Sequence, residues 1–177
     1  MNDELAQSKA VALIKAPIEK IDLGQWLFTL TDAEYQSCSP AHIAAGSNVS
    51  TDGKRMSINV EKIADNFLVQ HYVEEISTPS LCRVYSLSDS FSGFGHTKLG
   101  IRWEVALTRV SESLTEFMNT VVVLMTDDFA ASLKAAGLSD LKEVKAGMLE
   151  NLVAHNREET PLFAKDIERK ARQGVWD

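Results

Sequence analysis

The sequence predicts an α+β fold built on an antiparallel sheet of about seven strands and completed by helices. Strand-like runs follow one another at short intervals between residues 42 and 126, with no intervening helix long enough for a parallel crossover. After Asp127 the period of the apolar residues changes from two to about 3.6, which is the period of a helix. Together these patterns favour an antiparallel meander followed by a helical C-terminus.

The length and composition fit one globular domain. The chain has 177 residues, of which 45% are hydrophobic and 24% are charged, and it carries a net charge of −7. Its 18 lysines and arginines are scattered, which argues against nucleic acid as a partner. No run approaches the roughly 18 apolar residues of a membrane span, and no segment has the order of a signal peptide. We therefore expect a cytoplasmic protein without a membrane span.

Cys38 and Cys82 are the only cysteines. Two isolated cysteines without CxxC spacing are typical of reduced, partly buried thiols in a cytosolic protein, and a single disulfide is the alternative. A chain of this length buries enough surface to fold without such a staple.

The N-terminal segment is weakly patterned. Residues 1–20 are expected to form an extension with a short helix that Pro17 ends. Residues 21–174 are expected to form a single domain.

This domain is expected to open with a strand over residues 21–30. The capping-box spacing of Thr31 and Glu34 predicts a short helix after it. The meander follows, and Asp52-Gly53 marks its first hairpin turn. The predicted strands of the meander cover residues 42–49, 55–60, 67–76, 81–87, 99–110 and 114–126.

A stretch rich in serine and glycine interrupts the meander. Residues 86–95 hold four serines and two glycines, so they predict a flexible loop or an irregular edge. Phe91 and Phe94 within this loop would form a gate over a pocket.

Two helical segments close the chain. Gly137 is placed to end the first as its C′ residue, and Ser139-Asp140 predicts the cap of the second. Thr160-Pro161 predicts a new helical turn or a kink. The apolar stripe of the second segment contains Leu141, Val144, Met148, Leu149, Leu152 and Val153, and it continues through Leu162, Phe163 and Ile167.

The order of these elements resembles the helix-grip fold of the START-like superfamily, which includes the Bet v 1 allergens and the polyketide cyclases. The resemblance covers about residues 21–170 and is carried by the closing helix and by spans such as residues 101–107. It implies a curved sheet wrapped on a long C-terminal helix around an internal cavity. It rests on no catalytic motif, and the helical excursion after the first strand is shorter than the usual helix pair. A lipocalin-like barrel is the alternative, because Gly24-Gln25-Trp26 matches the Gly-x-Trp of lipocalins.

The alternation along the strands predicts which side chains line such a cavity. It places His71 among apolar neighbours and gives the cavity two polar groups, an arginine and a tyrosine. A shift of one residue would reverse every assignment. His71 as a hydrogen-bonded core residue, and Arg83 paired with Glu104 on a solvated face, are the alternatives. The predicted pocket-lining residues are Phe67, His71, Arg83, Tyr85, Ile101 and Trp103.

Catalytic and metal-binding motifs are missing from the sequence. It contains no GxSxG, no GxGxxG and no glycine-rich phosphate loop. The segment 155–159 brings a histidine and two glutamates within one helical turn, but a second ligand pair at helical spacing and the HExxH motif are absent. We therefore predict a charged helix face there, and we expect no metal and no cofactor.

Three hypotheses for the function follow. The first is a binding protein for a small, mostly apolar molecule held in an internal cavity. The second is an enzyme of the cyclase or aromatase type in which His71, Arg83 or Tyr85 transfers a proton or anchors the substrate. The third is a partner-binding or oligomerisation domain, such as a homodimer, with Trp176 as the interface anchor.

Overall fold

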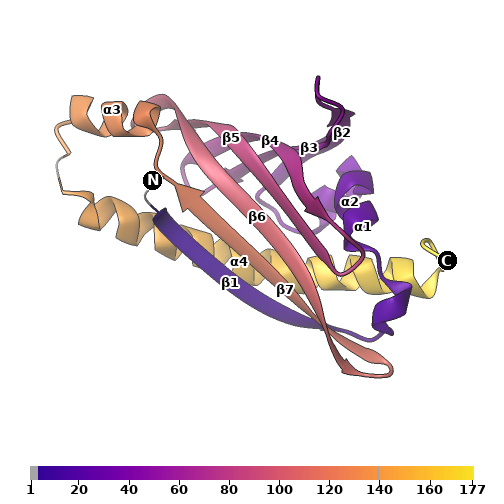
Figure 1. The fold of residues 1–177 in the computed structure, drawn as a ribbon. Coiled ribbons are helices and arrows are strands. Elements are labelled where there is room, and N and C mark those ends of the chain that lie inside the picture. The colour runs from indigo at the N-terminus through magenta and orange to yellow at the C-terminus, as the bar shows by residue number, and fades with distance from the viewer. Residues whose placement is uncertain (1–3, 139) are drawn as a thin grey trace.

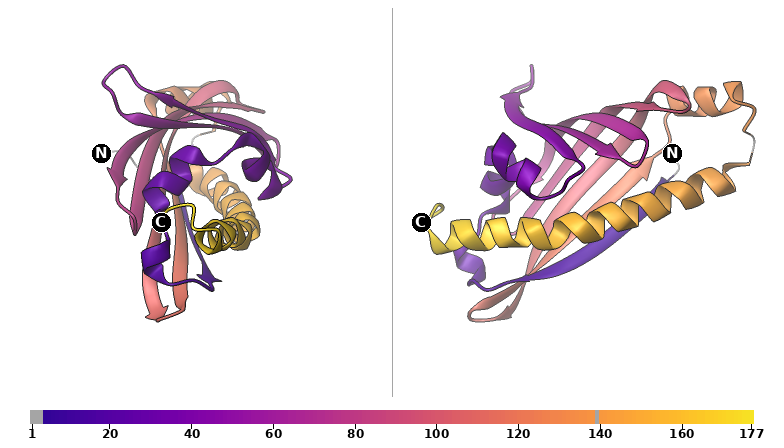
Figure 2. Two further views of the ribbon diagram at one scale, coloured as in Figure 1. Left: turned by 90° about the vertical axis from the view of Figure 1, so that its right-hand side faces the viewer. Right: turned by 180° about the vertical axis from the view of Figure 1, so that it is seen from behind.

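The computed structural model describes residues 4–138 and 140–177 and shows an α+β fold. A seven-stranded antiparallel sheet has the order β1-β7-β6-β5-β4-β3-β2. The sheet curves around the long helix α4, which runs along its concave face (Figures 1 and 2). The strands are β1 (Glu4–Ile14), β2 (His42–Val49), β3 (Arg55–Ile63), β4 (Asn66–Ser77), β5 (Leu81–Ser92), β6 (Gly95–Ser111) and β7 (Leu114–Leu124). The helices are the 3-10 turn η1 (Ile18–Lys20), α1 (Leu23–Thr29), α2 (Asp32–Ser37), α3 (Asp127–Ala135) and α4 (Leu141–Arg172).

The N-terminal segment is an edge strand of this sheet. The predicted short helix is wrong, because β1 pairs antiparallel with β7, with Lys9 opposite Thr120. The segment is therefore part of the domain's sheet, and the expected extension over residues 1–20 is corrected for the described residues from Glu4 onward. Small side chains such as Ser8 and Ala12 lie at inward positions. The inward and outward residues of β1 therefore differ little in hydrophobicity, and the period of two that marks a strand is weak here.

The strand predicted over residues 21–30 is also wrong, because this segment forms helix α1. Asp22 is its N-cap and accepts a hydrogen bond from the backbone N–H of Gln25. The buried residues follow the helical spacing i, i+3, i+4, i+7, and they are Leu23, Trp26, Leu27 and Leu30. Gly24-Gln25-Trp26 therefore lies on a helix and not on a barrel strand, so the lipocalin alternative is wrong. Helices α1 and α2 form the pair that appeared to be shortened in the sequence.

The capping box, the meander and the closing helices are confirmed. The side chain of Thr31 accepts from Glu34 N, and the side chain of Glu34 accepts from Thr31 N. Gly137 has a positive φ of 74° after α3, as a C′ residue requires. Asp140 caps α4, whereas its predicted partner Ser139 lies outside the described residues.

Two local predictions need correction. The serine-rich stretch predicted as a loop is mostly strand, since β5 continues to Ser92 and β6 begins at Gly95. Its inward serines are buried, and Ser88 donates to Ser86 Oγ at 2.9 Å, so polar composition does not imply exposure here. Helix α4 runs through Pro161 to Arg172 as one helix.

The core lies between the sheet, α1 and the C-terminal half of α4. Trp26 is fully buried, and its ring meets those of Trp103, Phe117 and Phe163 edge-on at centroid distances of 6.3, 6.1 and 5.2 Å. Such edge-to-face contacts add to the free energy of apolar burial. Trp176 is half-buried and packs on this same core.

The first turns of α4 differ from the rest of the helix. Residues 141–150 are half-buried or exposed, whereas Leu152, Phe163 and Ile167 are buried. The helix therefore diverges from the sheet toward its N-terminus, and the pocket described below opens there. Among the helices of the described residues, none is both long and apolar enough to cross a bilayer. Both cysteines are buried and free, so the disulfide alternative is wrong.

Candidate functional site

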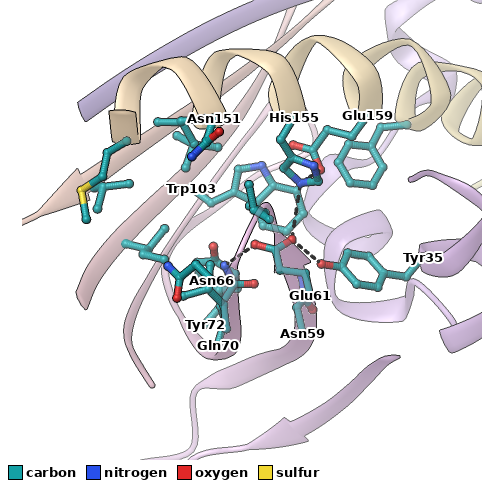
Figure 3. A pocket seen from close by; sticks show the side chains of 18 residues that line it. Tyr35, Asn59, Glu61, Asn66, Gln70, Tyr72, Trp103, Asn151, His155 and Glu159 are labelled. Carbon is teal, nitrogen blue, oxygen red and sulfur yellow. Dashed lines mark hydrogen bonds and ion pairs between the residues drawn. The ribbon is translucent and has the colours of Figure 1, made fainter. Parts of the chain in front are cut away.

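A pocket of about 100 Å³ lies between the concave face of the sheet and α4 (Figure 3). Strands β3, β4, β6 and β7 form one wall, α4 forms the opposite wall, and Tyr35 of α2 reaches in from the side. The apolar lining includes Leu68, Tyr72, Ile101, Trp103, Leu152 and Phe163. The polar lining includes Tyr35, Asn59, Glu61, Gln70, His155 and Glu159.

The two ends of the pocket differ in their exposure. Asn151 is exposed and Met148 half-buried at the end where α4 leaves the sheet. At the other end Tyr35, Glu61 and Glu159 are each less than a tenth exposed. A molecule would therefore enter beside Asn151 and meet the carboxylates at the closed end.

Two of the six predicted pocket residues line this pocket. Ile101 and Trp103 do, with exposures of 3% and 4%, because the alternation along β6 is clear. The other four lie on the opposite, convex face of the sheet, where Arg83 pairs with Glu104 at 2.6 Å. The residues on the convex face are Phe67, His71, Arg83 and Tyr85.

The error is a shift of one residue in the parity of β4 and β5. In β4 the buried positions are Leu68, Gln70 and Tyr72, so His71 points outward. Both faces of this strand carry bulky side chains, and a polar Gln70 at an inward position removes the contrast on which parity prediction depends. The enzyme hypothesis in its original form, with His71, Arg83 or Tyr85 in the cavity, is corrected accordingly.

The sequence analysis missed a cluster of two histidines and two glutamates at the closed end, which we call the His–Glu cluster. His42 comes from β2, Glu61 from β3, and His155 and Glu159 from α4. Their side chains are no more than 8% exposed, so the charged helix face predicted at residues 155–159 is wrong for His155 and Glu159, which are buried. The available signal was spacing, since Glu159 falls seven residues after Leu152 on the apolar stripe of α4.

Four atoms of the cluster converge. His42 Nε2 lies 3.2 Å from Glu159 Oε2 and 3.8 Å from Glu61 Oε2. His155 Nε2 lies 3.3 Å from Glu159 Oε2 and 3.4 Å from Glu61 Oε2. Each imidazole thus faces both carboxylates through its Nε2 atom. Figure 3 shows His155, Glu61 and Glu159 at this end of the pocket.

The remaining polar atoms of the cluster are held from outside. Tyr35 Oη donates to Glu61 Oε2 at 3.0 Å, and Gln70 Nε2 donates to Glu61 Oε1 at 2.8 Å. Asn119 Nδ2 donates to Glu159 Oε1 at 3.0 Å. His42 Nδ1 lies 2.7 Å from the backbone oxygen of Tyr35, and because a carbonyl only accepts, Nδ1 carries the proton. These contacts fix the orientation of three of the four side chains.

A second polar layer supports the site from α4 and the sheet. Trp103 Nε1 donates to Asn119 Oδ1 at 2.8 Å, which sets the orientation of that amide. Asn156 is fully buried and donates to Ser8 Oγ at 3.0 Å. Thr160 Oγ1 donates to the backbone oxygen of Asn156 at 2.6 Å. The first of these bonds joins β6 to β7, the second joins α4 to β1, and the third lies within α4 beside the His–Glu cluster.

The electrostatics of the cluster favour charged groups despite their burial. Burial disfavours the imidazolium of His155, but hydrogen bonds to Glu159 and Glu61 outweigh it and raise its pKa to about 10. Burial likewise disfavours the carboxylate of Glu159, but hydrogen bonds from His155 and His42 hold its pKa at about 2. Burial, and then the charges of Glu61 and Glu159, raise the pKa of Tyr35 well above its usual value. Near neutral pH Tyr35 is therefore a hydrogen-bond donor beside a buried carboxylate.

This arrangement has three chemical capacities. The carboxylates and Tyr35 can hydrogen-bond the polar end of a molecule whose apolar part lies against Trp103 and Leu152. Paired carboxylates and imidazoles can transfer protons. Imidazole and carboxylate donors that converge on one point can bind a metal ion; three of them, His42, His155 and Glu159, have donor atoms within 4.8 Å of one another.

Comparisons with known proteins identify the fold. No known family matches the sequence, and no curated protein matches it. An aromatase/cyclase from a Streptomyces species superposes with a TM-score of 0.65 at 10% identity, covering 94% of this chain and 95% of that one. A protein from Thermus thermophilus gives a TM-score of 0.55 at 15% identity, covering 94% and 97%.

A two-domain aromatase/cyclase from the steffimycin biosynthetic pathway is similar over one half of its length. The TM-score is 0.64 at 9% identity, covering 94% of this chain and 52% of that chain. Identities this low show the fold alone. The chain therefore has the same helix-grip fold as these aromatase/cyclases, as its sequence predicted.

Proposed function

We propose that this START-like domain binds a small, mostly apolar molecule in the pocket between its sheet and α4. The observation that carries the proposal is the division of one pocket into an apolar wall and a buried polar end. Trp103 and Leu152 would contact the apolar part, and Glu61 would accept a hydrogen bond from a polar group. Tyr35 and Gln70 already hold this carboxylate in place, and a carboxylate can accept more than one hydrogen bond per oxygen, so it favours a ligand group that donates.

The pocket volume limits the ligand. Sites for drug-sized molecules measure about 300–1,000 Å³, and a cavity of about 150 Å³ accepts benzene. The pocket of about 100 Å³ is smaller than either, so even a single small ring such as a phenol would fill it and part of its opening. A longer ligand would extend past Met148 and Asn151 toward solvent.

The test is to measure binding of small phenols and aliphatic alcohols by ligand-observed NMR. Leu152→Trp places a bulky side chain in the pocket, and His71→Ala is the matched control on the convex face. We expect the first variant to lose binding and the second to keep it. Binding that survives Leu152→Trp in a folded protein would contradict the proposal, as would wild-type protein that binds none of the molecules. Native mass spectrometry of the purified chain provides a separate search for a co-purified molecule.

A second candidate function is acid–base catalysis in the same pocket. It is favoured because His155 and Glu61 line the space that a ligand would fill. In this candidate function they take the place of His71, Arg83 and Tyr85, which face outward. Aromatase/cyclases share the fold, which is an analogy and not a mechanism. With a ligand in hand, Glu61→Gln would abolish turnover while preserving binding within about tenfold. A wild-type protein that binds the ligand but does not turn it over would leave a carrier as the only function.

A further inference from the structure

The His–Glu cluster contains more than a pair of salt bridges. Its four inner atoms are two imidazole Nε2 and two carboxylate Oε2, with nitrogen–oxygen separations of 3.2, 3.3, 3.4 and 3.8 Å. A tetrahedral ion with bonds of about 2.0–2.1 Å has ligand atoms about 3.3 Å apart. We infer that His42, His155 and Glu159, whose donor atoms lie within 4.8 Å of one another, bind one divalent first-row transition metal ion at the closed end of the pocket, with Glu61 as a neighbouring carboxylate.

The orientation of His42 is that of a metal ligand. Its Nδ1 faces the backbone oxygen of Tyr35 at 2.7 Å, so this nitrogen is the donor. Its Nε2 points into the cluster and lies 3.2 Å from Glu159 Oε2. An imidazole that donates from Nδ1 to a carbonyl has the usual form of a metal-bound histidine.

The outer contacts of the carboxylates are also those of metal ligands. Gln70 holds Oε1 of Glu61 at 2.8 Å, and Asn119 holds Oε1 of Glu159 at 3.0 Å. Each carboxylate thus turns its other oxygen toward the centre of the cluster. Hydrogen bonds of this kind orient metal ligands and tune their basicity.

The donor set selects the class of metal. Two imidazoles and one carboxylate suit zinc, iron and related ions, whereas magnesium and calcium prefer oxygen ligands alone. A divalent ion also balances two buried carboxylates, which are expensive to bury without compensating charge.

The site is open on one side. Glu61, His155 and Glu159 line the pocket, whereas His42 lies behind them on β2. A bound ion would therefore face the cavity and accept a further ligand, such as water or an oxygen atom of a phenol, carbonyl or carboxylate. This is the arrangement of a catalytic metal centre and not of a closed structural one.

The test measures metal binding without any pocket ligand, so its result is independent of the proposed binding function. The purified full chain is stripped with a chelator and titrated with Zn²⁺, and Co²⁺ serves as the spectroscopic probe. We expect one equivalent to bind, a tetrahedral Co²⁺ spectrum and a rise in melting temperature. His155→Ala and Glu159→Gln should weaken binding more than about 100-fold, since each removes a ligand. His71→Ala and His96→Ala, which alter histidines outside the cluster, should bind as the wild type does.

Folding of each variant is checked by circular dichroism. If His155→Ala and Glu159→Gln unfold, Asn119→Leu replaces them, because it removes the hydrogen bond to Glu159 Oε1, and it should weaken Zn²⁺ binding about 10–100-fold. A folded wild type that takes up no stoichiometric Zn²⁺ or Co²⁺ overturns the inference and leaves a buried network of hydrogen bonds and ion pairs among the two histidines and two glutamates. Equal Zn²⁺ affinity in the wild type and the folded cluster variants also overturns it.

Discussion

His155 Nε2 lies 3.3 Å from Oε2 of Glu159, one helical turn further along α4, and both side chains turn away from solvent into the pocket. Pairs at i and i+4 on an exposed helix contribute only a few tenths of a kcal/mol. Here the same spacing is buried against β2 and β3, where Glu61 and His42 complete the His–Glu cluster. The sheet therefore changes an ordinary helical pair into a polar centre.

Replacing Phe163 with alanine should destabilise the protein strongly. Its ring is 1% exposed, lies edge-on to Trp26 at 5.2 Å and lines the pocket. Removal of a buried phenylalanine costs about 3–5 kcal/mol, because the lost contacts leave a cavity. Urea denaturation measures the change in the free energy of unfolding. Leu149→Ala, at a position that is 43% exposed, is the control and should change it by less than about 0.5 kcal/mol. A similar small change for Phe163→Ala would contradict this account of the core.

Acid should destabilise the contact between α2 and the C-terminal end of α4. Burial alone would raise the pKa of Glu34, but hydrogen bonds from Lys170 and Thr31 outweigh it and hold the pKa at about 2. Because the folded-state pKa is lowered, the stabilisation is complete above the ordinary value of 4.5 and is lost as the pH falls toward 2. The Lys170–Glu34 distance is 2.9 Å, and the partial exposure of Glu34 limits its contribution to about 0.2–1 kcal/mol.

Thermal unfolding of wild type and Glu34→Gln between pH 6 and pH 2 checks this prediction. The variant should be less stable at pH 6, and the difference should shrink toward pH 2, where Glu34 of the wild type is itself protonated. Asp65→Asn, at an exposed turn, is the control. A difference between Glu34→Gln and wild type that is constant with pH would refute the assigned role.

Removal of the N-terminal strand should abolish cooperative folding. Deletion of residues 1–16 would expose the edge of β7 and remove Leu5 and Ile14, which are 4% and 0% exposed. It would also remove Ser8, the partner of the buried Asn156. Circular dichroism and size-exclusion chromatography should show an unfolded or aggregated chain.

Val11→Ser is the control for this deletion, because Val11 lies on β1 but is 56% exposed. It should unfold within about 0.5 kcal/mol of the wild type. A truncated chain with a native spectrum and a sharp unfolding transition would show that residues 1–16 are dispensable, as the sequence-based division at residue 20 implies.

Local patterns predicted most of the elements but not their faces. The hairpin turn at Asp52-Gly53, the capping box at Thr31 and the alternation of β6 were each read correctly, because each depends on residues close in the chain. β1 was missed because its inward residues are small. α1 resembles a strand in sequence because it contains a run of apolar residues, and the cap at Asp22 is the local feature that distinguishes it as a helix.

The sequence by itself determined the fold class, the antiparallel order of the meander and the inward position of Ile101 and Trp103. These follow from hydrophobic periodicity and turn chemistry, which operate over a few residues. Only the tertiary structure decided that Gln70 and Tyr72 face inward, and that His42 and Glu61 meet His155 and Glu159. A buried polar residue is indistinguishable from an exposed one in sequence until its partners are known. Those partners come from three separate elements, and the curvature of the sheet brings them together.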